Sequence, residues 1–334
     1  MERTTAILDI PAATFLPGLI RRAAEIEAPV QVLDRGTRVQ THYGLLDVFE
    51  DGERIQVELS SKDSVNLLYL RDTLDWHLGL EGLKHCITWA RMRAGANPAN
   101  MVLGHCESVT AVSPSFIRVR VRGDYSRFLD GGLHFRLLIA AKGSDWPYSD
   151  ETGGTVWPSG VEAWHRPAYT IRHICPHGLW MEFDIFRHEG GRVNDWAATL
   201  QEGEEVALTG PGGTGLTEAP WIGLVGDETA MPAIIRMIEG APLGTQGVAT
   251  IVVPSAADVQ PVSCPEGIQL TWAFRDQGAS VMDVFRAMQV PEGPRYVYVA
   301  AEKSEAALAR EHAKALGLKR GESHALAYWA AGEE

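Results

Sequence analysis

The sequence predicts a multi-domain protein of mixed α+β and α/β class, and three observations support this prediction. The chain has 334 residues, a length typical of two or three domains. Strand-like runs dominate from about residue 100 to 215, whereas strands and helices alternate from about 220 onward. The first 95 residues carry helical and strand-like patterns of their own. We therefore expect domains at residues 1–95, 100–216 and 217–334, with a linker near 92–100.

The N-terminal domain is predicted to be a small α+β unit. Residues 11–27 repeat apolar side chains at helical spacing, and residues 63–78 show a second apolar stripe. Two strand-like runs, 38–49 and 54–59, lie between these helices and flank Asp51-Gly52, a typical hairpin turn. No set of residues in this domain suggests catalysis.

The middle domain is predicted to be an antiparallel barrel. Along residues 117–122 Ile and Val alternate with Arg, so one face of this strand is expected to be buried and the other basic. Residues 133–141 form a nearly unbroken apolar strand. Residues 143–164 hold many Gly, Pro and Ser residues and are expected to form a long loop. Several short strands separated by turn signals are typical of a barrel.

The C-terminal domain is predicted to be a parallel α/β sheet, because strands and helices alternate along it. The expected strands are residues 221–225, 248–253 and 296–300, and the expected helices lie in residues 232–238, 280–288 and 305–316.

Composition excludes several classes of function. The formal net charge is −13 and the isoelectric point is near 5.3, which argues against nucleic acid and against anionic membrane surfaces as partners. No apolar run has the length of a membrane span, and the N-terminus leads into no signal-peptide core. The four cysteines form no C-x-x-C pair, which argues against an iron–sulfur cluster and fits a reducing cytoplasm. Nothing in the sequence indicates the oligomeric state.

One short segment could suggest a metal site. His173, Cys175 and His177 lie within five residues of one another. The neighbouring Pro176 and Gly178 favour a hairpin turn, and no second pair of ligands is visible. We therefore expect no metal site.

The segment Arg166-Pro-Ala-Tyr-Thr-Ile-Arg172 is the most informative part of the chain, because it places two cations, a ring and a hydroxyl on one extended stretch. On a strand, Thr170 points with Arg166 and Arg172, and Tyr169 points the other way. A flat anionic cofactor needs such groups: a ring to stack on it, a hydroxyl for its edge and guanidinium groups for its phosphates. The alternative interpretation is an ordinary edge strand with solvated arginines.

A second set of signals follows this segment. A strand-like run at residues 181–186 leads to Gly190 and Gly191, which permit a tight turn. Asn194 is the expected N-cap of the helix that follows, and a helix N-terminus suits a pyrophosphate. The turn at residues 210–213, Gly-Pro-Gly-Gly, then closes another strand.

These motifs resemble the siderophore-interacting protein family, bacterial flavin reductases of the ferredoxin-reductase-like superfamily. Six matches occur in order: residues 166–172, His188, Trp196-Ala197, residues 210–213, residues 226–233 (Gly-Asp-Glu-Thr-Ala-Met-Pro-Ala) and residues 328–332. The resemblance covers roughly residues 100–334. It implies a Greek-key barrel that binds FAD and a Rossmann-like nicotinamide domain. Residues 1–95 resemble a small domain of unknown function that sometimes accompanies this family.

The resemblance implies a set of FAD-binding residues: Arg166, Tyr169, Thr170, Ile171, Arg172, His188, Gly190, Gly191, Arg192, Val193 and Asn194. Tyr169 is expected to pack on the flavin ring and Thr170 to hydrogen-bond near its reactive nitrogen, so these two are the expected catalytic residues. His188 either touches the flavin or caps the strand end, and Arg192 either contacts a phosphate or is solvated.

The resemblance also implies nicotinamide-binding residues: Gly226, Asp227, Glu228, Thr229, Ala301 and Glu302. Residues 226–229 follow one strand and residues 301–302 end another, at the sheet edge where an α/β fold presents a ligand crevice. The segment is not a G-x-G-x-x-G fingerprint. Asp227 or Glu228 is expected to reach a ribose or the carboxamide, and Thr229 is the favoured polar contact.

The implied function is FAD-dependent reduction of a ferric siderophore or other ferric chelate by NADPH or NADH, with release of Fe(II). One alternative is a flavin reductase that supplies electrons to a partner protein, and another is a non-catalytic flavin- or chelate-binding protein. Lys303 and Arg310 are the expected substrate-binding cations. The tail carries Ala330 and Ala331 where the family often has Lys or Arg, which favours neutral over highly anionic chelates.

Overall fold

The computed structural model spans residues 1–334 and describes all of them except 93–96, 142, 189, 214–217, 320 and 333–334. The chain divides into two compact units. The first comprises residues 1–101 and 140–164, and the second comprises residues 102–139 and 165–334. The segment 140–164, which the sequence assigns to the barrel, is therefore grouped with the N-terminal unit.

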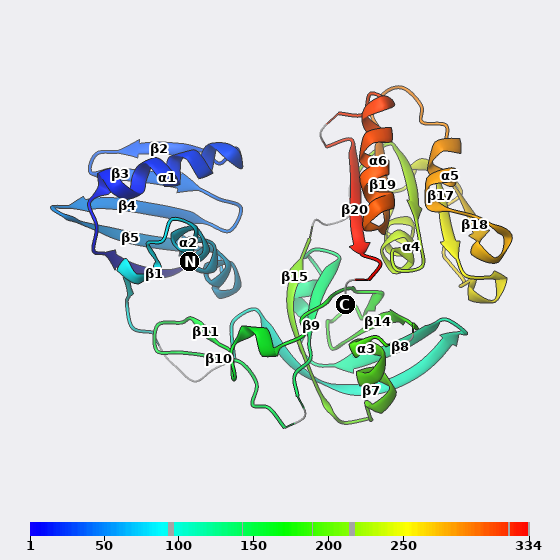
Figure 1. Cartoon of the computed structure of the whole chain (residues 1–334), viewed down its shortest axis with the longest axis horizontal. Helices are drawn as coiled ribbons and strands as arrows, with labels where there is room; N and C mark the ends of the chain where they lie inside the picture. The colour runs from blue at the N-terminus through cyan, green and yellow to red at the C-terminus, as the bar shows by residue number, and fades with distance from the viewer. Residues whose placement is uncertain (93–96, 142, 189, 214–217, 320, 333–334) are drawn as a thin grey trace. The chain divides into compact units, whose positions relative to one another are not determined.

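The first unit is built on a six-stranded sheet with the strand order β2-β3-β4-β5-β1-β6 (Figure 1). Its elements are β1 (Glu2–Leu8), α1 (Ala12–Glu25), β2 (Val30–Leu33), β3 (Gly36–Gln40), β4 (Leu45–Asp51), β5 (Arg54–Ser61), α2 (Ser64–Leu80), the 3-10 turn η1 (Lys84–Cys86) and β6 (Ile87–Trp89). Neighbouring strands of this sheet pair in the antiparallel direction. Side chains from both helices and from the sheet form one apolar core, so this part is α+β as predicted.

One predicted strand of this unit is wrong. The run 38–49 is two strands, β3 and β4, because a turn interrupts it. In that turn the Thr41 hydroxyl oxygen accepts the backbone N–H groups of Tyr43 and Gly44, each at 3.1 Å. A threonine hydroxyl that accepts nearby backbone N–H groups favours a turn over a continuous ladder. Strands β1, β2 and β6 were not predicted.

The segment 140–164 contains more structure than the predicted loop. It forms the hairpin β10 (Tyr148–Ser149) and β11 (Thr155–Val156), followed by the 3-10 turn η3 (Val161–Ala163). Arg71 of α2, which is 6% exposed, donates to the Thr152 carbonyl oxygen and, at 2.8 Å, to the Thr152 hydroxyl. Its guanidinium carbon also lies 4.5 Å from the centroid of the Trp89 ring. Arg71 thus anchors this segment within the first unit.

The barrel of the second unit is a seven-stranded sheet with the order β12-β9-β15-β7-β8-β14-β13 (Figure 1). Its elements are β7 (Met101–Ser113), β8 (Phe116–Arg122), η2 (Ser126–Phe128), β9 (His134–Leu138), β12 (Ala168–Thr170), β13 (His173–Ile174), β14 (Trp180–Phe186), α3 (Arg192–Thr199) and β15 (Glu205–Gly212). The core includes Phe135, Phe183 and Val119. Short antiparallel strands around one apolar core match the predicted barrel.

The C-terminal part of the second unit is a five-stranded parallel sheet with the order β18-β17-β16-β19-β20. Its elements are β16 (Trp221–Gly226), α4 (Met231–Glu239), β17 (Gln246–Val253), η4 (Ala256–Asp258), β18 (Ile268–Phe274), η5 (Arg275–Gln277), α5 (Val281–Ala287), β19 (Tyr296–Glu302), α6 (Lys303–Ala315) and β20 (Ser323–Trp329). The sheet has two apolar cores, one with α4 and one with α5 and α6. Figure 1 shows these helices on opposite faces of the sheet.

The helices of the second unit are short. In the described part of the chain, none of the helices is long and apolar enough to cross a membrane.

Candidate functional site

Strand pairing places Tyr169 and Thr170 at the edge of the barrel sheet. In the register of β12 and β9, Tyr169 lies opposite Phe135 and Thr170 lies opposite His134. The Tyr169 ring centroid lies 6.3 Å from that of Phe135 and 5.8 Å from that of Phe183, and burial raises the pKa of Tyr169. Thr170 is 5% exposed. The predicted split of the two side chains between opposite faces follows from this pairing.

A chain of polar contacts begins at Thr170. Its hydroxyl oxygen lies 3.3 Å from Nδ1 of His134, and Nε2 of His134 lies 3.3 Å from the Tyr328 hydroxyl of β20. The Tyr328 hydroxyl lies 2.5 Å from that of Tyr298 on β19. These contacts join the barrel to the parallel sheet within the second unit. Sequence reasoning missed His134 and Tyr298, because only the strand register places them beside Thr170 and Tyr328.

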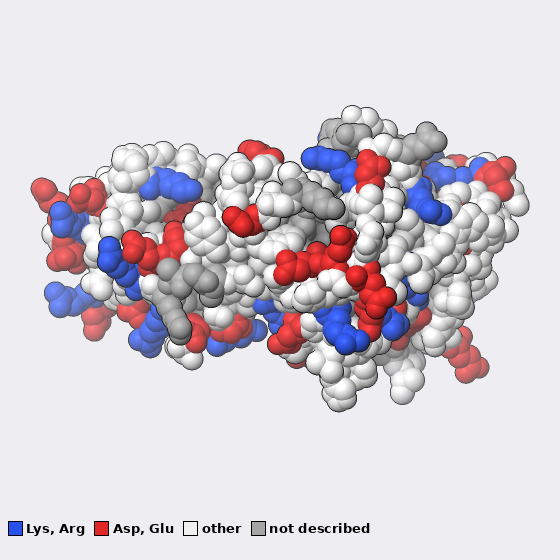
Figure 2. All heavy atoms as spheres, turned by 90° about the horizontal axis from the view of Figure 1, so that it is seen from below, with Lys and Arg blue, Asp and Glu red and all other residues white. Residues whose placement is uncertain are grey.

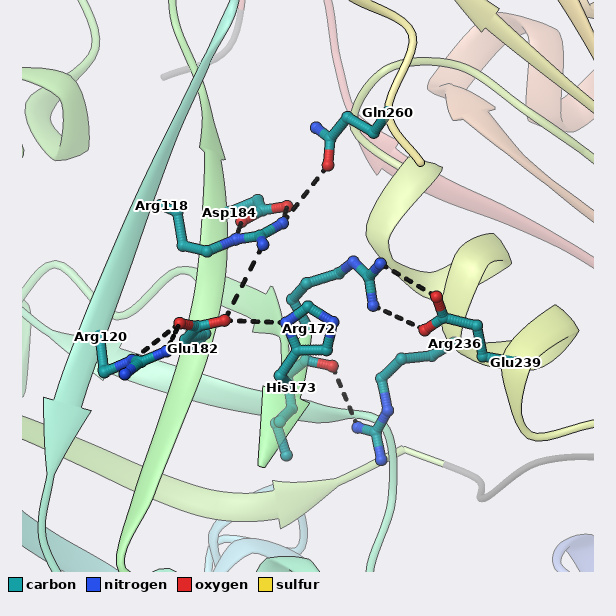
Figure 3. A network of polar contacts seen from close by, with 10 residues as sticks. Arg118, Arg120, Arg172, His173, Glu182, Asp184, Arg236, Glu239 and Gln260 are labelled. Carbon is teal, nitrogen blue, oxygen red and sulfur yellow. Dashed lines mark hydrogen bonds and ion pairs between the residues drawn. The ribbon is translucent and has the colours of Figure 1, made fainter. Parts of the chain in front are cut away.

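The side chains of Ile171 and Arg172 contact other parts of the second unit than the Thr170 hydroxyl does. Arg172 is 3% exposed and donates to both carboxylate oxygens of Glu239 on α4, at 2.8 and 3.3 Å (Figure 3). Ile171 is fully buried in the barrel core, and its carbonyl oxygen accepts a hydrogen bond of 3.1 Å from Arg236. Two guanidinium nitrogens of Arg172 are thus paired with Glu239, while its buried Nε has no hydrogen-bond partner among the described residues.

Arg166 lies two residues before β12. Its carbonyl oxygen accepts a 2.9 Å hydrogen bond from Arg136 of β9, and its side chain is half-buried. Arg136 on β9 is thus bonded to the backbone just before β12. Arg136 was not among the predicted site residues.

The basic face predicted for β8 is neutralised by acids on β14. Arg118 donates to Asp184 at 2.6 Å, and Arg120 donates to Glu182 at 2.8 Å (Figure 3). His173, considered above as a metal ligand, lies 2.8 Å from the other Glu182 oxygen. Burial acts to raise the pKa of Glu182, but the hydrogen bonds from His173 and Arg120 outweigh it and lower that pKa to about 2. This face is thus an ion-pair network rather than a surface for anions.

The helix start after β14 differs from the prediction by three residues. Helix α3 begins at Arg192, and Gly191 occupies the N-cap position, so the prediction of Asn194 as N-cap is wrong. Instead, the Asn194 amide nitrogen donates to the Phe186 carbonyl oxygen at 3.3 Å. The reason is local: Gly190 has φ +79°, a value that lets the chain turn early.

The remaining residues of this turn lie at the surface or in the core. The exposed His188 ring stacks on Phe186 at 6.5 Å between centroids. A Cβ on Gly191 would lie 2.4 Å from Cε1 of His188, so this close approach requires glycine unless the ring moves. Val193 packs in the barrel core, while Gly190 and Arg192 are exposed. The turn therefore offers backbone N–H groups at its surface, as a pyrophosphate site needs.

The predicted nicotinamide-binding residues are brought together at one edge of the parallel sheet. Gly226 at the end of β16 pairs with Ala300 of β19, so residues 226–229 and 301–302 are neighbours. A Cβ on Gly226 would lie 2.8 Å from the Ala300 carbonyl oxygen, and glycine is required there. The carboxyl ends of neighbouring parallel strands form the usual ligand crevice of such sheets.

The acids at this edge have partners within the protein. Asp227 is fully buried; it accepts hydrogen bonds from the Thr229 hydroxyl at 2.6 Å and from Nε1 of Trp329 at 2.8 Å. Glu228 accepts from Arg275 at 3.0 Å. Glu302 caps α6, accepting the Ser304 N–H at 2.6 Å. Asp227 thus holds Trp329, the residue next to Tyr328, against the end of β16.

The two cations predicted to bind substrate lie on α6. Lys303 is its first residue, and Nε of Arg310 donates to the Ala325 carbonyl oxygen at 3.0 Å. On the face shown in Figure 2, Lys and Arg side chains are interspersed with Asp and Glu.

Comparisons with known proteins agree with this architecture. Residues 105–215 match the siderophore-interacting FAD-binding domain, and residues 219–332 match the siderophore-interacting protein domain. The chain is 28% identical over 240 residues to ferric vibriobactin reductase ViuB of Vibrio cholerae, covering 66% of this chain and 86% of ViuB. It is 26% identical over 203 residues to the NADPH-dependent ferric-chelate reductase of Escherichia coli, covering 58% of this chain and 79% of that protein.

A solved structure adds to these matches. The siderophore-interacting protein SipS from Aeromonas hydrophila is similar with a TM-score of 0.60 and 26% identity, covering 70% of this chain and 93% of SipS. The two family models meet at the boundary between the barrel and the parallel sheet, and both lie outside the first hundred residues. Over residues 105–332 the chain therefore belongs to the siderophore-interacting protein family and carries that family's FAD-binding domain.

Proposed function

We propose that this protein is an FAD-dependent reductase that passes electrons from NADPH or NADH to a ferric siderophore or another ferric chelate and releases iron as Fe(II). The observation that carries the proposal is the continuous set of contacts between the FAD-binding barrel and the carboxyl edge of the parallel sheet. It runs from Thr170 through His134 to Tyr328, whose neighbour Trp329 is bonded to Asp227. A reductase needs its flavin and nicotinamide sites adjacent in this way.

The residues at the barrel edge fit FAD. Tyr169 and Thr170 supply a ring and a hydroxyl on adjacent positions, and Arg166 supplies a cation two residues before the strand. The turn at residues 190–194 supplies backbone N–H groups for a pyrophosphate. When bound, a flavin accepts two electrons as a hydride and releases them singly, which is the chemistry that a ferric acceptor requires. The protein's own part is to bind and orient it.

The proposed nicotinamide site consists of residues 226–229 and 301–302. Their position at the carboxyl ends of β16 and β19 supports this assignment. The Thr229 hydroxyl and the Asp227 carboxylate are hydrogen bonded to each other, so they are expected to shape the crevice.

A ferric chelate is the substrate that the relatives favour. ViuB is named as a ferric vibriobactin reductase, and the Escherichia coli relative as a ferric-chelate reductase. Iron(III) is held tightly by hard oxygen donors, and its reduction weakens that grip. The free cysteines in the described part of the chain, Cys86, Cys106, Cys175 and Cys264, are in keeping with a cytoplasmic location, which we propose with the function.

An anaerobic experiment tests the function. The purified protein is reconstituted with FAD and mixed with NADPH or NADH, and the flavin absorbance is followed. We expect bleaching by at least one donor, then recovery of the absorbance when a ferric chelate is added, with Fe(II) trapped by a chromogenic chelator. A flavin that stays oxidised with both donors would indicate a non-catalytic binding protein. Bleaching without reoxidation by any of a panel of ferric chelates would favour a flavin reductase that serves a partner protein.

A further inference from the structure

Arg236 brings a cation from the parallel sheet to the strand segment on which the proposed FAD site rests. It lies on α4, the helix that follows the turn at residues 226–229. One of its terminal nitrogens donates to the Ile171 carbonyl oxygen at 3.1 Å, and Ile171 is the residue after Thr170 (Figure 3). The guanidinium group is therefore bonded to the peptide chain directly beside Thr170.

The charge of Arg236 is not balanced by a bonded acid. Glu239, three residues further along α4, accepts hydrogen bonds from Arg172 on both of its carboxylate oxygens, at 2.8 and 3.3 Å. Among the residues that the structure describes, Arg236 forms no ion pair of its own, and its hydrogen bond goes to a neutral carbonyl group. The pair of Arg172 and Glu239 is neutral as a whole, so Arg236 leaves one positive charge in excess at this junction.

The excess charge lies in a partly dry environment. Arg236 is half-buried. Burial lowers the pKa of Arg236 and the nearby charge of Arg172 lowers it further, while Glu239 acts in the opposite sense. An arginine still keeps its proton at neutral pH. Because a partly buried cation without a bonded acid is unfavourable, a group that carries negative charge is stabilised near it.

The electrostatic field of Arg236 reaches the residues around Thr170. His134 lies opposite Thr170 in the register of β9 and β12, and its Nδ1 atom is 3.3 Å from the Thr170 hydroxyl oxygen. Burial lowers the pKa of His134, and the positive charge of Arg236 lowers it further. A charge that acts on His134 also acts on a group bound beside Thr170, because both lie in the same poorly solvated region.

We propose that Arg236 supplies the positive charge that stabilises the reduced form of a flavin bound beside Thr170, so that it raises the midpoint potential of bound FAD and speeds hydride transfer to it. A reduced nicotinamide donates a hydride, which is one proton with two electrons, and becomes the oxidised nicotinamide cation. The flavin ring that accepts the hydride gains one negative charge. A cation fixed in place before the transfer favours this charged product over the neutral oxidised ring. The inference rests on the proposed function, since it requires FAD beside Thr170.

The test measures the midpoint potential of bound FAD by spectroelectrochemistry in the FAD-reconstituted full-length protein, with Arg236→Gln and Arg236→Lys compared with the wild type. Gln removes the charge but keeps an N–H donor for the Ile171 carbonyl oxygen, whereas Lys keeps the charge. We expect Arg236→Gln to weaken the binding of reduced FAD about tenfold relative to oxidised FAD, which lowers the midpoint potential by about 30 mV. Flavin reduction by reduced nicotinamide should become slower in the same variant, as rapid mixing would show. Arg236→Lys is expected to keep most of the wild-type potential.

Two further variants control for net charge and for folding. Arg286→Gln removes an arginine of α5 that is more than half exposed and lies 3.7 Å from Asp283, so it changes the net charge of the protein by the same amount. Its midpoint potential is expected to equal that of the wild type. Arg236→Met removes the charge while it keeps an apolar stem, and it serves as the test variant if Arg236→Gln fails to fold. It is expected to show the same loss of potential.

Two results would overturn the inference. One is an Arg236→Gln or Arg236→Met variant with the midpoint potential of the wild type. The other is an Arg236→Lys variant that loses as much potential as Arg236→Gln, which would show that the bond to Ile171 matters and the charge does not. Failure of the proposed function gives a different result: the wild-type protein would then hold no FAD, or would hold FAD that neither nicotinamide reduces.

Discussion

At the scale of single residues, Arg172 is the predicted site residue that has a strong partner within the protein. From the sequence, either Arg166 or Arg172 is expected to contact the FAD phosphates, and in the fold Arg172 is buried and paired with Glu239 (Figure 3). Removal of one partner from a buried ion pair leaves a charge without compensation, and this typically costs about 3–5 kcal/mol. Two roles of Arg172 are therefore to be distinguished by experiment: the predicted one in FAD binding, and one in the junction between the barrel and α4.

Arg172→Ala and Glu239→Gln distinguish these roles. If Arg172 serves the junction, both variants lower the free energy of unfolding, by about 3 kcal/mol for Arg172→Ala, and FAD affinity changes equally in both. If Arg172 also holds a phosphate, FAD affinity falls in Arg172→Ala alone. Chemical denaturation and FAD fluorescence titration measure the two effects. We expect the first result, because both terminal nitrogens of the Arg172 guanidinium group donate to Glu239.

Glu182 gives a prediction for pH. Its pKa in the folded state is about 2, below the ordinary value of 4.5, so its ionised form stabilises the fold above pH 4.5 and this contribution is lost as the pH falls toward 2. Glu182→Gln should be less stable than the wild type at pH 7, and the gap should narrow between pH 4.5 and 2. Thermal unfolding across this range checks it. Glu107→Gln removes the more exposed pair with Arg122 and should show little effect at any pH.

At the scale of elements, the end of β16 is the most constrained part of the candidate nicotinamide site. A Cβ on Gly226 would lie 2.6 Å from Cβ of Ala230 and 2.8 Å from a backbone oxygen, so the strand and helix can approach only with glycine. By contrast, a Cβ on Gly79 of α2 would meet no atom within 4 Å.

Gly226→Ala should therefore destabilise the protein by about 1–3 kcal/mol and impair reduction by nicotinamide, while the FAD content stays near that of the wild type. Gly79→Ala should be neutral or stabilising by up to about 1 kcal/mol. Thermal unfolding, the absorbance ratio of bound FAD and the KM for reduced nicotinamide report these effects. A Gly226→Ala variant that loses FAD would mean that the β16 edge supports the flavin instead.

At the scale of the whole molecule, the first unit is formed by two stretches of chain. Residues 140–164 belong to it. The chain leaves the barrel after Ile139 and returns at His165, and these two residues form an antiparallel bridge. Bridged residues of this kind can be joined by a short turn. The predicted N-terminal domain, residues 1–95, does not include this second stretch of chain.

The division predicts the outcome of two truncations. Deletion of residues 1–95 alone removes Arg71 from the segment 140–164, so we expect a less stable protein with reduced yield. Deletion of 1–95 combined with replacement of 140–164 by a short Gly-containing turn should give a folded core that keeps FAD. Bound FAD after gel filtration is the measurement. A flavin-free product from the second truncation, with the full-length protein retaining FAD, would show that the first unit supports the flavin site.

The charge of the molecule predicts substrate preference. The net charge is −13, and the cations of β8 are paired with acids, which leaves Lys303 and Arg310 of α6 as the proposed contacts for a chelate. We expect faster flavin reoxidation by a neutral hydroxamate iron complex than by a trianionic catecholate complex. Stopped-flow rates at rising salt test this, and a fast catecholate rate that drops steeply with salt would reveal a cationic site not identified here.

Local signals in the sequence determined much of the fold. The buried face of β8 and the alternation of strands and helices after residue 220 could be predicted from the periodicity of apolar side chains. This periodicity can be read along the chain without knowing which residues pack together. The predicted helix at residues 63–78 is α2, and Asp63 is its N-cap, because its carboxylate accepts the Asn66 N–H. The motif at residues 166–172 and the glycines at 190, 191 and 226, on which the proposed cofactor sites rest, are likewise visible in short stretches of chain.

What the tertiary structure alone decided concerns pairs that are distant in sequence. Strand register brings His134 to Thr170, and the fold brings Tyr328 to His134 across 194 positions. Glu239 forms an ion pair with the buried Arg172. Arg71 hydrogen-bonds Thr152 and so anchors the segment 140–164 in the first unit. A side chain's partner depends on which surfaces the fold places together, and sequence periodicity specifies a face but not the residue opposite it.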